Sequence, residues 1–185
     1  HSLGEYSALV ATGSLNLADA VRLVRIRARA MQDAVPVGSG AMAAILGLED
    51  AAVLAVCDQA SADAKAHGEP AVVEAVNFNA PSQVVVAGHR EAVERACVLA
   101  KAAGAKRALP LPVSAPFHAS LLEPAGLVLR GALAELAFQT PGIPLVNNID
   151  VAIESGPDRI RDALVRQAWG PVRWVEVVLR LQSMG

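Results

Sequence analysis

The first ten residues, HSLGEYSALV, place a serine directly before an apolar run of helical character. A serine on a sharp turn before a helix is how several enzyme families expose a nucleophile. A serine at the same position is also a common N-cap of an ordinary helix. Ser2 is therefore a candidate nucleophile, and the short motif alone leaves both interpretations open.

A nucleophilic serine needs a base, and His118 is the histidine whose surroundings suit that role. It lies in SAPFHAS, an apolar loop with no reason of its own to hold an imidazole, whereas His67 and His89 fall at helix ends. Such a lone histidine is most often structural, and it acts as a base only within hydrogen-bond reach of Ser2. No acid between the two lies at an obvious strand end, so the chain order of an α/β-hydrolase fits poorly. A main-chain carbonyl is an alternative partner for the imidazole.

A third chemical candidate is an arginine in the run LADAVRLVRIRARAMQDAV. At about 100° per residue, Arg22, Arg25 and Arg29 share one face, which is typical of a solvated stripe. Arg27 lies about 140° away from Arg22, on the apolar side of the same helix. Because a guanidinium keeps its charge, burial requires an anionic partner. The partner is either a core Asp or Glu or the carboxylate of a substrate.

The composition favours a single α/β domain with an aliphatic core. Hydrophobic residues make up 54% of the 185 residues, and aromatic residues only 3%. The net charge of −2 argues against a nucleic-acid partner, and no apolar run of about 20 residues could span a membrane. Cys57 and Cys97 have no metal-type spacing and are expected to be reduced core thiols, so no metal site is expected.

Hydrophobic periodicity and turn residues predict an α/β body that is interrupted by a small inserted domain. From about Gly38 to Ser114 the predicted order is β-α-β-β-α-β, the ferredoxin-like motif. The body comprises residues 1–37 and 115–185, and the insertion comprises residues 38–114. Strands are predicted at 41–48, 71–78, 82–88, 106–111 and 143–148. Helices are predicted at 3–13, 17–35 with Asn16 as the cap, 49–68, 89–104, 121–136, 158–169 and 172–183. We expect the chain to be truncated at both ends, since it starts at a histidine and stops on LQSMG without a terminal signal.

Several long blocks at ordered spacing carry a resemblance to a known family. They include HSLGEYSALVATG, VNFNAPSQVVVAG, GAKRALPLPVSAPFHASLL, VNNID and RDALVRQ. The chain resembles the malonyl-CoA:acyl carrier protein transacylases, an acyltransferase family of bacterial fatty-acid synthesis, over essentially all 185 residues. The resemblance implies an α/β-hydrolase-like acyltransferase body with an inserted ferredoxin-like subdomain, and a cytoplasmic enzyme. It also implies malonyl-CoA and acyl carrier protein as partners, and no cofactor beyond the coenzyme A thioester that serves as substrate.

The resemblance also implies roles for individual residues. Ser2 matches the nucleophile, His118 the general base, and Arg27 the arginine that pairs with the malonyl carboxylate. Gln167 matches the residue whose backbone carbonyl holds the histidine, and the Leu3 backbone N–H matches one oxyanion donor. The family's other donor, a glutamine in a GQGSQ-type loop, has no counterpart in this sequence.

Two further residues are expected at the substrate pocket. Met31 follows Arg27 on the apolar side of the predicted helix and is expected to contact substrate. In the wider family an aromatic residue before the histidine accompanies malonyl rather than methylmalonyl, so Phe117 either narrows the pocket or is a plain packing residue.

Three other functions remain open. A serine hydrolase or thioesterase would release free acid without a thiol acceptor. An acyltransferase domain of a polyketide synthase would use similar residues within a longer chain. A non-catalytic carrier-protein docking module would tolerate loss of Ser2; Lys106, Arg107 and Arg130 are possible contacts to an acidic carrier protein.

Overall fold

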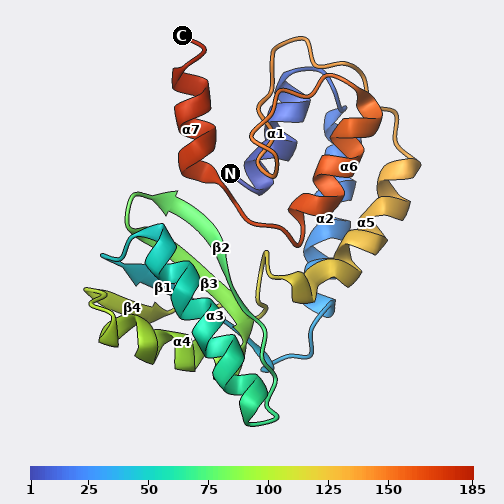
Figure 1. The fold of residues 1–185 in the computed structure, drawn as a ribbon. Helices are drawn as coiled ribbons and strands as arrows, with labels where there is room; N and C mark the ends of the chain where they lie inside the picture. Colours follow the sequence, from blue (N-terminus) through green and yellow to red (C-terminus); the bar gives the residue numbers. More distant parts are fainter.

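The structure is a computed structural model that describes residues 1–185. It has an α/β fold in which helices α1, α2, α5 and α6 group together, while α3 and α4 lie against a β-sheet (Figure 1). The elements are α1 (Leu3–Ala11), α2 (Leu17–Asp33), β1 (Gly40–Leu46), α3 (Asp50–Ala66), β2 (Val73–Ala80), β3 (Gln83–His89), α4 (Arg90–Ala102), β4 (Arg107–Pro110), the 3₁₀ turn η1 (Ser120–Leu122), α5 (Glu123–Ala134), α6 (Pro157–Gln167) and α7 (Trp174–Gln182).

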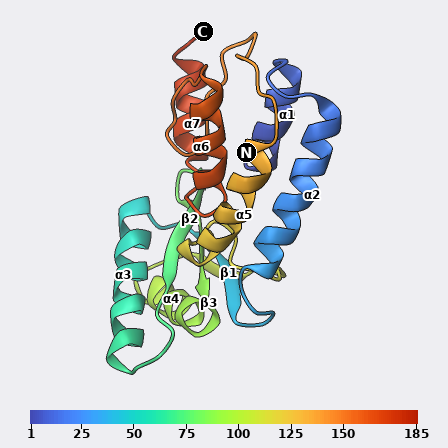
Figure 2. The same cartoon turned by 90° about the vertical axis from the view of Figure 1, so that its right-hand side faces the viewer.

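The sheet has four strands in the order β2-β3-β1-β4, and every neighbouring pair is antiparallel. Side chains alternate between its faces, as the two-residue period of a strand requires. Ala43 and Ile45 point into a core with α3 and α4, whereas Met42 points to the opposite face and packs near Phe117. Figure 2 shows α3 and α4 on the side of the sheet away from α2 and α5.

The helical group has its own aliphatic core, formed by α1, α2, α5 and α6. Its largest fully buried side chains are Tyr6, Leu9, Leu23, Leu129, Leu133 and Leu164. The Asn16 side chain caps α2 by accepting a hydrogen bond from the Asp19 N–H, as predicted. On α2, the side chains of Arg22, Arg25 and Arg29 are exposed and that of Arg27 is buried, which confirms the helical-wheel prediction.

The segment that precedes α7 joins the sheet to the helical group. Val172 bridges β2 in parallel: its N–H donates to the Val76 carbonyl at 2.7 Å, and its carbonyl accepts from the Phe78 N–H at 2.9 Å. The predicted helices and the first four predicted strands agree with the structure to within a few residues at their ends. None of the helices combines the length and the apolar character that a membrane span requires.

The predicted strand at residues 143–148 is wrong. The segment makes only one isolated antiparallel bridge, between Val146 and Ile153, and forms no ladder. Its apolar residues suit a strand, but a strand exists only where a neighbour offers a row of backbone partners. No strand of the sheet lies beside it, so its backbone turns at Asn147 and Asp150 instead.

Candidate active site

Ser2 stands at the turn before α1 in an unusual backbone conformation, with φ 41° and ψ −96°. It occupies the N-cap position, yet its side chain makes no capping hydrogen bond. Its Oγ lies 3.0 Å from His118 Nε2 and accepts a hydrogen bond from Arg27 Nη2 at 2.6 Å. The hydroxyl therefore faces a base and a cation rather than the helix amides, and the positive φ is the kind of strain that persists at functional turns.

His118 is held by a backbone carbonyl on its other side. Its Nδ1 lies 3.0 Å from the Gln167 carbonyl oxygen, at the end of α6. Because a carbonyl only accepts, Nδ1 must carry the proton, and in the neutral ring Nε2 is then the acceptor. The Ser2 hydroxyl can donate to that nitrogen, which is the arrangement a general base requires. Gln167 thus supplies the main-chain partner that the sequence left as an alternative to an acid.

The surroundings of His118 keep its imidazole neutral. Burial, and then the positive charge of Arg27, lower its pKa from 6.5 to about 4. Only 6% of the residue is exposed. The ring is therefore free to accept a proton throughout the neutral range.

Arg27 is buried without a carboxylate in contact with it. It is 8% exposed, and none of the ion pairs in the structure includes it. Its Nη2 donates to Ser2 Oγ and to Gln167 Oε1, its guanidinium lies 5.4 Å from the centre of the Tyr6 ring, and its Nε has no partner. The core ion pair that the sequence left open is therefore absent, and the cation can receive an external anion.

These residues open onto a pocket of about 520 Å³ between the helical group and the sheet. Ser2, Arg27 and His118 line it together with Met31 and Phe117, the two residues predicted to contact substrate. The remaining lining residues are His1, Ala28, Gln32, Met42, Asn77, Leu111 and Val113. The site thus brings together side chains from both predicted parts of the chain.

Leu3 is the first residue of α1, so its backbone N–H belongs to the first turn of the helix. Amides of that turn have no partner within the helix and carry the positive end of its dipole. The Leu3 N–H therefore has the character that an oxyanion donor needs, directly after the candidate nucleophile.

Two functional features were missed by sequence reasoning. The Gln167 side chain, and not only its carbonyl, touches the site, because its Oε1 accepts from Arg27 Nη2 at 3.1 Å. Glu5 lies one turn after Ser2 on α1, and its Oε2 accepts a hydrogen bond from Gln167 Nε2 at 2.9 Å. The signal for Glu5 was available: it is a carboxylate three positions from the serine, beside the buried Tyr6 and near Leu9.

The fold that carries this serine–histidine–arginine cluster is that of the acyl transferase domain family. Residues 1–183 match the acyl transferase domain family, and the chain belongs to it. It is 55% identical over all 185 residues to the malonyl CoA-acyl carrier protein transacylase of Escherichia coli K12 and spans 58% of that protein's length.

Solved structures show the same likeness. The acyl-carrier-protein S-malonyltransferase of Burkholderia pseudomallei is 62% identical and superposes with a TM-score of 0.95. A malonyl-transacylase in complex with its type II PKS acyl-carrier protein is 49% identical, with a TM-score of 0.94. The chain is covered completely in both comparisons and spans 58% of each of those chains.

Proposed function

We propose that the protein transfers a malonyl group from malonyl-CoA to the phosphopantetheine thiol of acyl carrier protein, for fatty-acid synthesis, through a malonyl-serine intermediate. The observation that carries the proposal is the position of Ser2 Oγ, between His118 Nε2 at 3.0 Å and the guanidinium of Arg27 at 2.6 Å. A buried cation without a carboxylate in contact, beside an activated serine, fits an acyl group that itself ends in a carboxylate. The names of the similar proteins support the same reaction.

In the first half-reaction, His118 Nε2 removes the Ser2 hydroxyl proton as Oγ attacks the thioester carbonyl. The carbonyl oxygen gains negative charge, and the Leu3 N–H donates to it; the loss of one such donor typically costs on the order of 10²–10³ in rate. The tetrahedral intermediate expels the coenzyme A sulfur, which takes the proton from His118. A malonyl ester on Ser2 remains, and the imidazole is neutral again.

In the second half-reaction, the carrier-protein thiol takes the place of coenzyme A. His118 removes its proton, the sulfur attacks the ester carbonyl, and Ser2 Oγ leaves with that proton. The two halves share one serine and one base, so the kinetics should be ping-pong. Gln167 holds the imidazole in the same tautomer throughout.

Arg27 selects the acyl group by its carboxylate. Its Nη1 donates no hydrogen bond within the chain, and its buried Nε is unpartnered, so donors remain for an anion. Met31 and Phe117 are apolar walls of the same pocket. We assign to Phe117 the narrowing that disfavours a methylmalonyl group, a one-methyl discrimination typically worth about 1–3 kcal/mol.

We further propose that residues 38–114 form a ferredoxin-like subdomain inserted into an α/β-hydrolase-like body, residues 1–37 and 115–185. The β-α-β-β-α-β order and the antiparallel strand order β2-β3-β1-β4 support this division. The pocket between the two parts then takes its nucleophile from the body, while Met42 and Asn77 reach it from the insertion.

A second candidate acceptor is a carrier protein of polyketide synthesis. It is favoured by the likeness to a malonyl-transacylase solved with its type II PKS acyl-carrier protein. The acyl-serine chemistry is identical in the two cases, so the two candidates differ only in the protein that delivers the thiol.

Mass spectrometry of the full chain after incubation with malonyl-CoA, without acceptor, tests the proposal. A malonyl adduct on the Ser2 peptide, absent in Ser2→Ala and discharged by carrier protein with its phosphopantetheine arm, is the expected result. Release of malonate without transfer would identify a serine hydrolase instead. Carrier-protein binding that Ser2→Ala preserves, with no adduct in the unsubstituted chain, would identify a docking module.

A further inference from the structure

The Gln167 side chain forms hydrogen bonds to three residues in and beside the site. It is fully buried, and each polar atom of its amide is in use. Nε2 donates to the Ser2 carbonyl at 3.0 Å and to Glu5 Oε2 at 2.9 Å, while Oε1 accepts from Arg27 Nη2 at 3.1 Å. One amide therefore contacts the backbone of the candidate nucleophile and the candidate substrate cation at once.

The partners of this amide permit only one orientation. The Ser2 carbonyl only accepts hydrogen bonds and the Arg27 guanidinium only donates them, whatever the charge on Glu5, whose carboxyl pKa is raised by burial. A flipped amide would set its oxygen against the Ser2 carbonyl and its NH₂ group against the guanidinium, so at least these two bonds would be lost. Buried polar groups without partners are costly, and the flip is therefore excluded while these partners stay in place.

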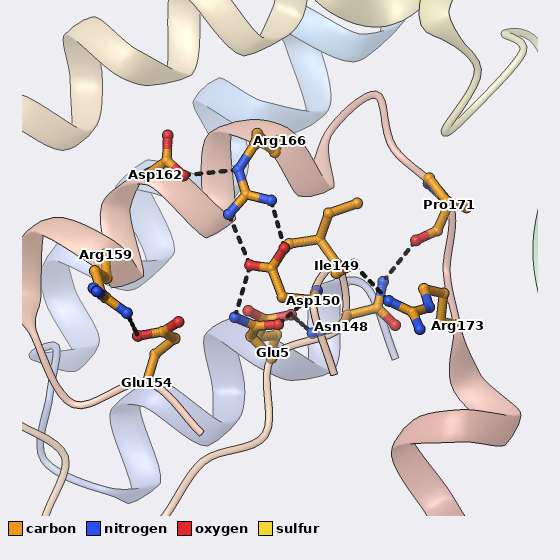
Figure 3. A network of polar contacts seen from close by, with 11 residues as sticks. Glu5, Asn148, Ile149, Asp150, Glu154, Arg159, Asp162, Arg166, Pro171 and Arg173 are labelled. Atoms are coloured by element: carbon orange, nitrogen blue, oxygen red, sulfur yellow. Dashed lines mark hydrogen bonds and ion pairs between the residues drawn. The ribbon is translucent and has the colours of Figure 1, made fainter. Parts of the chain in front are cut away.

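Glu5 is itself held by a second hydrogen-bond donor. Its Oε2 also accepts from the Asn148 N–H at 3.1 Å, as Figure 3 shows. The loop that carries Asn148 is fixed to α6 by Arg166, whose Nη1 and Nη2 each donate to the Asp150 carboxylate at 2.7 Å. Arg166 directly precedes Gln167, so one turn of α6 holds both the anchor of Glu5 and the amide that Glu5 contacts.

We propose that Glu5 is a positioning residue that fixes the orientation of the Gln167 amide, and through it the Ser2 turn and the Arg27 guanidinium. This inference rests on the acyl-transfer function proposed above. Glu5 does not line the pocket of Ser2, Arg27 and His118, and the ion pairs of the structure leave it without a direct contact to Arg27. One amide separates the carboxylate from the guanidinium, so Glu5 holds the cation in place without occupying the donors that a substrate carboxylate needs.

Two conservative substitutions separate orientation from charge. Glu5→Gln keeps the side-chain length and an acceptor oxygen for Gln167 Nε2 and the Asn148 N–H, but it removes the charge. Glu5→Asp keeps the charge, but it withdraws the carboxylate by one carbon–carbon bond. The same two substitutions at Glu135, exposed at the end of α5, are the matched controls.

Each variant of the full chain is labelled at Ser2 with a fluorophosphonate, which reports the activated serine without coenzyme A. Each is also assayed for malonyl and acetyl adducts, and its unfolding midpoint is measured. We expect Glu5→Gln to label within about threefold of the unsubstituted chain, and Glu5→Asp to label at least about tenfold more slowly, since misplacements near 1 Å can cost up to 10²-fold. The malonyl-to-acetyl ratio should fall in Glu5→Asp alone.

The opposite order, with Glu5→Asp active and Glu5→Gln impaired, would assign the effect to charge and overturn the proposal. If both variants kept the labelling rate and the malonyl-to-acetyl ratio of the unsubstituted chain and only their unfolding midpoints fell, Glu5 would have a purely structural role and the proposal would be overturned. An unsubstituted chain that reacts with the fluorophosphonate but forms no malonyl adduct refutes the proposed function, and the order of the labelling rates still decides the role of Glu5. A chain that fails both reactions refutes both, since it has no activated serine to position.

Discussion

Lowering the pH from 8 to 5 should leave Ser2 almost as reactive as at neutral pH, because His118 stays unprotonated. Burial and the charge of Arg27 lower the pKa of His118 to about 4. With that pKa, about nine tenths of the imidazole is neutral at pH 5, whereas an ordinary histidine with a pKa near 6.5 would be only about 3% neutral. The two cases therefore differ by about thirtyfold in the fraction of active base.

The assay is the rate of Ser2 labelling by an uncharged fluorophosphonate between pH 4 and 8. A neutral reagent is chosen because a substrate carboxylate at Arg27 would offset the charge that helps to lower the pKa of His118. The rate should halve near pH 4, and in Arg27→Met it should halve at a higher pH. A midpoint near pH 6.5 in the unsubstituted chain would refute the assignment of a buried, neutral imidazole.

The same shift of the His118 pKa predicts a loss of stability in acid. The folded-state pKa lies below the unfolded value, so below pH 6.5 the unfolded chain binds a proton that the folded chain does not. The free energy of unfolding therefore falls as the pH drops from 6.5 towards 4, by about 2 kcal/mol from this group at pH 5. Urea unfolding at pH 7 and pH 5 measures it, with His118→Gln as the reference in which this contribution vanishes.

Four further results are expected. Arg27→Ala should lower the malonyl-to-acetyl ratio of adduct formation by about tenfold or more, since hydrogen bonds to charged groups contribute about 1.5–3 kcal/mol; an unchanged ratio would contradict the carboxylate contact. Gly88→Ala should lower the free energy of unfolding by about 1–3 kcal/mol, because its Cβ would lie 2.0 Å from the Val72 carbonyl oxygen. Gly131→Ala, in open space on α5, should raise it by about 0.5–1 kcal/mol in the same urea titration. Burial raises the pKa of the Cys57 thiol to about 12, so iodoacetamide should modify Cys57 only in urea, and alkylation mapped to Cys57 in the folded chain would contradict that burial.

The sequence predicted those features that depend only on residues close together in the chain. The burial of Arg27 followed from the angle between side chains on a single helix, and the cap at Asn16 followed from the first turn of that helix. The prediction of a strand at residues 143–148 was wrong because a strand depends on residues far away in the chain. A strand depends on a partner that its own residues do not encode, and here Val146 finds only one bridge.

The candidate site was predicted in its residue types but not in its contacts. Ser2 and His118 are 116 positions apart, so no spacing rule could establish the 3.0 Å between their side chains. The resemblance assigned Gln167 only through its carbonyl, because a sequence does not reveal which way a buried amide points. Glu5 was overlooked although it stands in the opening motif, since its importance arises from Gln167, 162 positions away.

The distance along the chain between Ser2 and Gln167 also determines when the site can form during folding. The contacts of Ser2 that matter for chemistry come from residues 27, 118 and 167, and the segment after α6 contacts β2 through the bridge between Val172 and Asn77. Contacts between residues so far apart form late, because a long loop must close before any of them is gained. Helical signal should therefore return early on refolding, and a reactive serine should be among the last features to reappear. Without residues 166–185, Ser2 would keep His118 and Arg27 as neighbours, but the Gln167 carbonyl that holds the imidazole and the Gln167 amide that contacts Arg27 would be missing.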